Sequence, residues 1–137
     1  MKKLLFFAIL FMACMGLQSC VLEADNTPDF NIKEQSANTA IIITLEGCSY
    51  SAAAKRFFTQ AFPDSLYRVK YLEVSRDNRK DEAYEALKSF QYYYDLDEDQ
   101  SPWIAFGNKY IQGWDFEKEQ VARRWMEEYK REKPFVW

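Results

Sequence analysis

The sequence predicts an α/β domain whose mixed four-stranded sheet is covered by helices on both faces. From residue 40 onward, segments with strand character and segments with helical spacing follow one another in the order β-α-β-α-β-β-α. Strands that are separated by helices are expected to pair in parallel. The last two strands are joined by a short turn and must pair antiparallel, so the sheet is mixed.

The first half of the domain is predicted to form a strand, a helix and a second strand. Residues 40–45 are mostly β-branched, which is typical of a strand that is buried on both faces. Gly47 interrupts this run, and residues 51–62 then have helical spacing. The apolar stripe of that helix consists of Ala54, Phe58 and Phe62. Pro63 ends the helix, and residues 67–74 alternate like a strand.

A second helix is expected over residues 80–90, with Asp77 or Asn78 as its N-cap. Residues 95–100 are acidic, and we interpret them as a solvated loop. Up to this point, predicted strands and predicted helices alternate along the chain, as the predicted fold class requires.

The last third of the chain is predicted to form a hairpin and a final helix. Strands over residues 103–106 and 110–114 flank a turn that begins at Gly107. Asp115 is expected to cap a helix over residues 116–131. The inner face of that helix is predicted to consist of Phe116, Val121, Trp125, Met126 and Tyr129.

The N-terminus differs from the rest of the chain. Lys2 and Lys3 precede a largely apolar run over residues 4–17, which is short for a membrane span but typical of the apolar region of a secretory signal peptide. An uncleaved membrane anchor and a buried helix are the alternatives. The lysine pair at the very start of the chain favours export.

The apolar run is followed by Leu-Gln-Ser-Cys, which resembles a bacterial lipobox. This resemblance implies that residues 1–19 are removed and that Cys20 is acylated. Two or three acyl chains hold a protein stably on a membrane. We therefore expect a protein of the bacterial cell envelope that faces the periplasm or the exterior. Residues 20–39 are polar and are interpreted as a flexible tether, and residues 40–133 as the domain.

Charge and composition exclude several classes of function. The formal net charge of −3 becomes −5 once Lys2 and Lys3 are removed, so the chain has no electrostatic reason to bind nucleic acid. The chain contains no histidine, which excludes Ser-His and Cys-His nucleophiles and any metal site with histidine ligands. We expect a monomer.

Cysteine usage points to a single reactive thiol. Processing removes Cys14 and acylates Cys20, so Cys48 is left as the one free thiol and no internal disulfide can form. Cys48 lies where the first strand meets the first helix. Unpaired N–H groups and the helix dipole lower the pKa of a thiol at such a position, and Ser51 is spaced to donate its hydroxyl to the sulfur. The alternative is a cysteine that serves as a small buried apolar residue.

Three segments of the chain resemble the thioredoxin superfamily, and within it the glutaredoxins most of all. Residues 48–51, Cys-Ser-Tyr-Ser, match the Cys-x-x-Cys/Ser site, and Ser101-Pro102 matches the loop that carries a cis proline opposite the active sulfur. Residues 113–115, Gly-Trp-Asp, are similar to the segment with which glutaredoxins hold glutathione. The resemblance implies catalytic roles for Cys48, Tyr50, Ser51 and Pro102, and substrate-binding roles for Ser101, Trp103, Gly113 and Asp115.

The sequence departs from the glutaredoxin pattern at two positions that bear on chemistry. Ser51 replaces the second cysteine, so Cys48 cannot close an internal disulfide. Glu46 stands where glutaredoxins carry a lysine, and its charge is expected to raise the pKa of Cys48 and to repel the carboxylates of glutathione. We therefore expect no cofactor, and the residues argue against glutathione as a ligand.

Two functions remain open. The first is a monothiol oxidoreductase that acts through Cys48 on thiols or disulfides of exported proteins. The second is a non-catalytic domain that holds an extended peptide or a partner protein in the cis-proline groove, with Tyr50 and Trp103 exposed for contact. The pKa of Cys48 distinguishes the two functions.

Overall fold

A computed structural model of the chain describes residues 27–77, 81–96 and 100–132. The elements follow the predicted order. They are β1 (Ala40–Leu45), α3 (Ser49–Ala61), β2 (Val69–Val74), α4 (Glu82–Tyr94), β3 (Trp103–Phe106), β4 (Lys109–Gln112) and α5 (Phe116–Met126). A short helix, α2 (Ile32–Gln35), precedes them, and a 3₁₀ turn (Glu127–Tyr129) follows α5.

The four strands form one mixed sheet in the order β2-β1-β3-β4. β1 pairs in parallel with β2, β3 pairs antiparallel with β1, and β4 pairs antiparallel with β3. At the centre of the sheet, Ile42 lies between Tyr71 of β2 and Ile104 of β3. This topology confirms the predicted mixed α/β sheet and is that of the thioredoxin fold.

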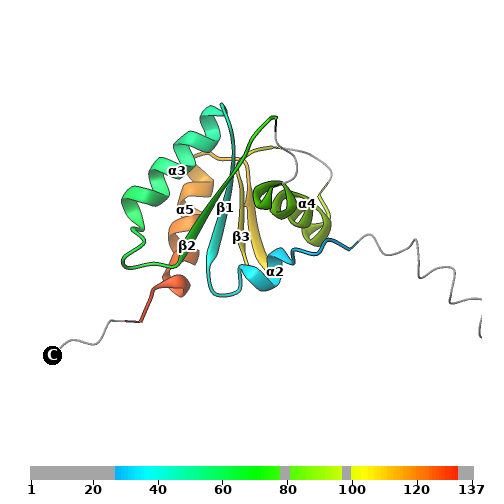
Figure 1. Cartoon of the computed structure of the whole chain (residues 1–137). Helices are drawn as coiled ribbons and strands as arrows, with labels where there is room; N and C mark the ends of the chain where they lie inside the picture. Colours follow the sequence, from blue (N-terminus) through cyan, green and yellow to red (C-terminus); the bar gives the residue numbers. More distant parts are fainter. Residues whose placement is uncertain (1–26, 78–80, 97–99, 133–137) are drawn as a thin grey trace, which may run out of the picture.

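Helices cover both faces of the sheet (Figure 1). Ala40 and Ile42 of β1 face the layer formed by α3 and α5, whereas Ile41 and Ile43 face the layer formed by α2 and α4. Alternate residues of a strand point to opposite faces, so a strand between two helical layers needs apolar residues at every position. This is why the β-branched run of β1 predicted a strand buried on both sides.

Several boundaries differ from the predicted ones. α4 begins at Glu82 rather than at residue 80, because Asp81 is its N-cap and accepts a hydrogen bond from the N–H of Tyr84. Asp77 lies in a bend and donates its N–H to the hydroxyl of Ser75 instead. The other expected cap, Asn78, lies outside the described residues. α3 begins two residues earlier than predicted, β2 begins two residues later, and β4 covers only Lys109–Gln112.

The last helix is followed by a 3₁₀ turn that begins at residue 127. The first residue of this helix, Phe116, was predicted to join the core but does not. Phe116 is 73 % exposed, whereas Ala122 and Met126 are buried. At 100° per residue, Phe116 is rotated roughly 120° from Ala122 around α5, which places it to the side of the helix face that Ala122 buries. The prediction that Phe116 faces inward was therefore wrong.

The segment before β1 was predicted to be a tether. Its C-terminal part packs against the domain. Ile32 is completely buried, and its N–H donates to the hydroxyl of Ser89 in α4. The Ser36 hydroxyl accepts from the N–H of Gly107, and the Ser36 carbonyl accepts from the hydroxyl of Tyr129. We call residues 32–36 the N-terminal strap, and it closes the end of the sheet at which β1 begins (Figure 1).

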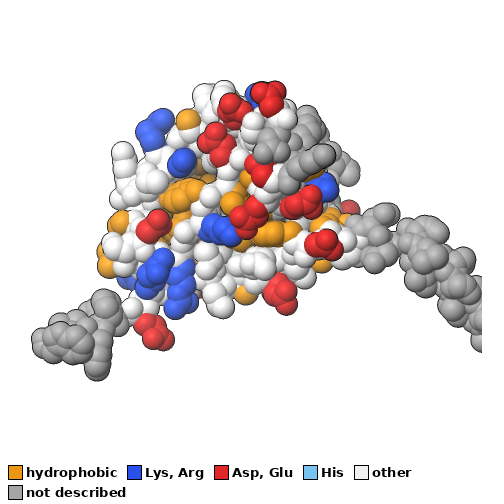
Figure 2. Space-filling view, viewed as in Figure 1, with side chains coloured by type: hydrophobic (Ala, Val, Ile, Leu, Met, Phe, Trp, Pro, Cys, Tyr) orange, Lys and Arg blue, Asp and Glu red, His pale blue; other side chains and the backbone are white. Residues whose placement is uncertain are grey.

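Acidic and basic side chains are interspersed on the face of the domain that Figure 2 shows, with apolar surface between them. Among the described helices, none is both long and apolar enough to cross a membrane. The predicted signal peptide and the lipidation residue Cys20 lie outside the described residues.

Candidate thiol site

The site is built at the C-terminal end of β1. The strand ends at Leu45, and Gly47 adopts a positive φ of 79°, a conformation that residues with a side chain rarely take. This turn places Cys48 at the N-cap of α3, with extended backbone angles of −94° and 125°. The sulfur of Cys48 therefore lies at a helix N-terminus, where an anion is favoured.

Ser101 makes the most direct contact with this sulfur. The hydroxyl of Ser101 donates a hydrogen bond to Sγ of Cys48 over 2.7 Å, from a residue 53 positions away in the sequence. The bond between Ser101 and Pro102 is cis, as the sequence predicted. The resemblance gave Ser101 only a role in substrate binding. The sequence carries no signal for its side-chain contact with the sulfur, which depends on how two distant loops meet.

Ser51 lies one turn along α3 and is 2 % exposed. Its hydroxyl oxygen accepts a hydrogen bond from the N–H of Leu45 over 2.9 Å, which ties the helix to the end of β1. The hydroxyl proton is still available, and the Ser51 hydroxyl also acts on the Cys48 sulfur. Ser51 therefore joins the strand to the helix in addition to its predicted role at the thiol.

The pKa of the Cys48 thiol is lowered by this environment. Burial alone raises the pKa, but the hydrogen bond from the Ser101 hydroxyl, the N–H and hydroxyl of Ser51 and the N–H of Tyr50 together lower it by more. Hydrogen bonds that favour the charged form of an acid stabilise the thiolate, which is the reactive species in disulfide exchange.

Glu46 does not act on the thiol as predicted. Its carboxylate accepts a hydrogen bond from the backbone N–H of Arg76 over 3.2 Å, and its carbonyl accepts from the Arg76 side chain. Glu46 is not among the groups that shift the pKa of Cys48. The expectation that this carboxylate raises the pKa was wrong, because the side chain is held against Arg76.

A groove of about 480 Å³ opens beside the sulfur. It brings together most of the predicted site residues, namely Cys48, Tyr50, Ser101, Gly113 and Asp115, and adds Gln100, Trp114 and Lys118. Tyr50 is 62 % exposed at its rim. We call this the thiol groove.

The far end of the thiol groove is fixed by main-chain contacts. The N–H of Gly113 donates to the carbonyl of Pro102, and Asp115 caps α5 by accepting from the N–H of Lys118. The ammonium group of Lys118 donates to the carbonyl of Gln112 over 2.7 Å. Gly113 has a positive φ of 82°, which residues with a side chain rarely adopt, and a Cβ at this position would lie 3.0 Å from that ammonium group. Lys118 was not predicted as a site residue from the sequence, and it is the only lysine or arginine among the groove's described lining residues.

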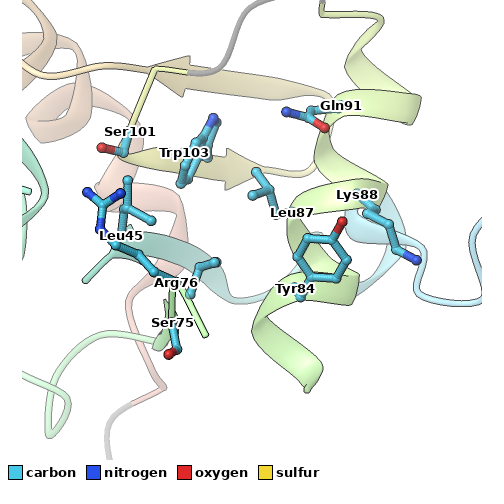
Figure 3. A pocket seen from close by; sticks show the side chains of 10 residues that line it. Leu45, Ser75, Arg76, Tyr84, Leu87, Lys88, Gln91, Ser101 and Trp103 are labelled. Carbon is cyan, nitrogen blue, oxygen red and sulfur yellow. The ribbon is translucent and has the colours of Figure 1, made fainter. Parts of the chain in front are cut away.

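Trp103 is the predicted site residue that the structure places elsewhere. It is 2 % exposed and faces the layer of α2 and α4 rather than the thiol groove. It lines a second pocket, of about 320 Å³, between α4 and the ends of β1 and β2 (Figure 3). The expectation of an exposed Trp103 was wrong, because the first residue of β3 pairs with Ile43 in the middle of the sheet.

The described residues contain no group of three or more cysteine or acidic side chains that could hold a metal ion. The site that the fold builds is therefore a single thiol in a partly open groove, with hydrogen-bond donors arranged around the sulfur.

No protein-family model matches the chain, and no curated protein sequence matches it significantly. Among solved structures, the chain is similar to the crystal structure of a glutaredoxin from Archaeoglobus fulgidus, with a TM-score of 0.44 and 19 % sequence identity. That match covers 69 % of this chain and 96 % of the glutaredoxin.

Proposed function

We propose that the protein is a monothiol oxidoreductase that carries out thiol–disulfide exchange through Cys48. The observation that carries this proposal is the hydrogen bond from Ser101 to the Cys48 sulfur at the N-terminus of α3. A hydroxyl that donates to a sulfur stabilises the thiolate more than the thiol. A cysteine that serves only as a small apolar residue has no need of such an arrangement.

The reaction begins when the Cys48 thiolate attacks one sulfur of a substrate disulfide. A bond forms between the Cys48 sulfur and that sulfur, the substrate disulfide breaks, and its second sulfur leaves as a thiolate. An external thiol, from a small molecule or a protein, then attacks the mixed disulfide and releases Cys48. In this second step the Cys48 thiolate is the leaving group, and a lowered pKa makes it a better one.

An external thiol is required because Ser51 occupies the position of a second cysteine. Its hydroxyl is bonded to the N–H of Leu45 and cannot attack a disulfide under physiological conditions. The mixed disulfide therefore persists until another thiol arrives, which makes the intermediate suitable for trapping.

The alternative, a non-catalytic binding domain, relied on Tyr50 and Trp103 as exposed contact residues. Tyr50 is exposed beside Cys48, but Trp103 is buried. The lowered pKa of Cys48 favours exchange chemistry over binding alone.

We also propose that the protein is anchored to a membrane of the bacterial cell envelope through lipid on Cys20 and acts as a monomer on exported proteins that bear thiols or disulfides. The support is the order of Lys2, Lys3, the apolar run and the lipobox-like sequence. Cys20→Ala should abolish labelling of the protein by radioactive fatty acid and release it from membranes. Unchanged retention with an intact N-terminus would indicate an uncleaved anchor instead.

The exchange activity is tested by the pH dependence of alkylation in a variant in which Cys14 and Cys20 are replaced by serine, so that Cys48 is the sole thiol. We expect the alkylation midpoint to lie below that of a free cysteine. We also expect reaction with a chromogenic aromatic disulfide to release one equivalent of thiol. Cys48→Ser is the control. Alkylation no faster than that of free cysteine at every pH would support the binding-domain alternative.

A further inference from the structure

The pocket lined by Trp103 is separate from the thiol groove and is not used by the proposed reaction. We call it the α4 pocket. Its floor is apolar, formed by Leu45, Leu87 and Trp103, and Figure 3 shows Arg76 on one side and Lys88, on α4, on the other. Its volume of about 320 Å³ lies at the lower end of the range for ligand pockets, which is enough for one large side chain or a small fragment.

The charge of the α4 pocket is opposite to that of the chain. The chain carries a net charge of −3, yet both charged residues among the described lining are cations, Arg76 and Lys88. Lys88 is paired with Glu85 at 3.2 Å. Arg76 forms no ion pair within the described part of the chain, and its side chain donates only to the carbonyl of Glu46, at 3.3 Å. Its guanidinium can therefore donate its remaining N–H groups to an incoming carboxylate.

The ring of Trp103 forms part of the floor of the α4 pocket. The indole N–H of Trp103 is buried and has no hydrogen-bond partner among the described residues. This N–H is not exposed to the pocket, so the group that the pocket offers to an acidic side chain is the guanidinium of the exposed Arg76, beside an apolar floor.

Ser101 connects the α4 pocket with the thiol. It lines both the α4 pocket and the thiol groove, and its hydroxyl is bonded to the Cys48 sulfur. A substrate whose sulfur lies at Cys48 is therefore next to the α4 pocket, and a polypeptide can reach it with a side chain from a neighbouring position. An aliphatic stem with a carboxylate at its end matches both the floor and the rim.

We propose that the α4 pocket binds an acidic side chain of a polypeptide substrate, located within a few residues of the cysteine that Cys48 attacks. This inference rests on the proposed function and names its substrate class, a polypeptide disulfide with a nearby glutamate or aspartate. The pocket then acts as a specificity site that holds the substrate while the exchange takes place.

The experiment uses two peptides that each carry one cysteine as a mixed disulfide with thiopyridine and differ only in Glu or Gln near that cysteine. Peptide pairs place the variable residue one to four positions to either side. The protein is the processed chain with Cys48 as its sole thiol. At the best position, we expect the Glu peptide to react about tenfold faster than the Gln peptide, a ratio within reach of one charge-assisted contact.

Two variants identify the source of this ratio. Arg76→Gln should reduce the Glu-to-Gln ratio to about twofold or less, a range left by long-range attraction. Arg76→Lys should retain part of the ratio. Arg124→Gln is the matched control, because it removes the same charge from an exposed site on α5 and should leave the ratio unchanged. Equal rates for the two peptides at all positions, or a ratio that Arg124→Gln lowers as much as Arg76→Gln, would overturn the proposal.

Two further measurements separate the possible failures. A small uncharged aromatic disulfide tests the thiol alone, so slow reaction with it would mean that the proposed function has failed. Rapid reaction with that probe but no preference for the Glu peptide would remove only the α4 pocket. The mixed disulfide of glutathione with thiopyridine has the same leaving group as the peptides and carries its carboxylates on a small molecule. If it outpaces every Glu peptide with the same dependence on Arg76, the substrate is a small thiol and the polypeptide assignment is wrong.

Discussion

Replacing Ser101 by alanine removes a single hydroxyl that lies 2.7 Å from the Cys48 sulfur and donates to it. A hydrogen bond to a charged group contributes about 1.5–3 kcal/mol. The groove is partly open to solvent, so we take the lower end, about 1.5 kcal/mol, which corresponds to roughly a tenfold loss in thiolate stability. The pKa of Cys48 should therefore rise in Ser101→Ala.

The effect on rate is smaller than the effect on thiolate stability, because a more basic thiolate is also a better nucleophile. With a Brønsted coefficient of about 0.45, a tenfold destabilisation of the thiolate slows exchange only about threefold at pH values below both pKa values. Above both pKa values the sign reverses, and Ser101→Ala should react about threefold faster than the wild type. This crossover distinguishes the loss of a hydrogen bond from general damage to the site.

The assay is the rate of exchange with an aromatic disulfide from about pH 4 to pH 10, in the variant with Cys48 as its sole thiol. Ser101→Thr is the control, since it keeps a hydroxyl at the same position and should retain a profile close to that of the wild type. Superimposable profiles for the wild type and Ser101→Ala, or slower exchange of Ser101→Ala at every pH, would refute the argument.

Three further predictions follow from packing and hydrogen bonding. Ser51→Cys should form an internal disulfide with Cys48, visible as a loss of free thiols that dithiothreitol reverses; two persistently free thiols would contradict the placement of these residues. Tyr71→Phe should leave the free energy of unfolding unchanged or raise it, because the Tyr71 hydroxyl is buried without a partner in the described structure, whereas Tyr129→Phe should lower it by about 1 kcal/mol in the same urea titration, because the Ser36 carbonyl loses its donor. Ile32→Ala should lower the free energy of unfolding by about 2–5 kcal/mol if the N-terminal strap belongs to the domain, and a change under about 0.5 kcal/mol would return it to the tether.

The parts of the fold that the sequence predicted correctly are those with a local signal. β1 is a β-branched run, the buried stripe of α3 repeats every four residues, and the hairpin turns at Gly107. Each of these patterns reflects a periodicity or a turn residue within a few positions. The order of these elements was enough to predict the mixed sheet.

The parts that the sequence did not predict depend on contacts between distant residues. The N-terminal strap has only one isoleucine to indicate burial, and its partners Ser89 and Gly107 are more than 50 residues away. The outward position of Phe116 depends on the rotation of α5 against the sheet. The contact between Ser101 and Cys48 joins two loops that lie 53 residues apart, and no local pattern specifies it.

The N-terminal strap also determines how the protein would meet its partners. The strap lies where β1 begins, and Cys48 lies where β1 ends, so the chain leaves the domain at the pole opposite the thiol (Figure 1). If Cys20 carries the lipid, the seven residues from 20 to 26 span at most about 25 Å when fully extended, because Thr27 already contacts Tyr92 of α4 and Phe30 packs against the core. The reactive sulfur would then lie on the side of the domain opposite the point at which this short linker is attached. The sulfur would meet proteins in the aqueous space more readily than disulfides at the lipid surface. The length of the linker would set how far from the membrane the sulfur can react.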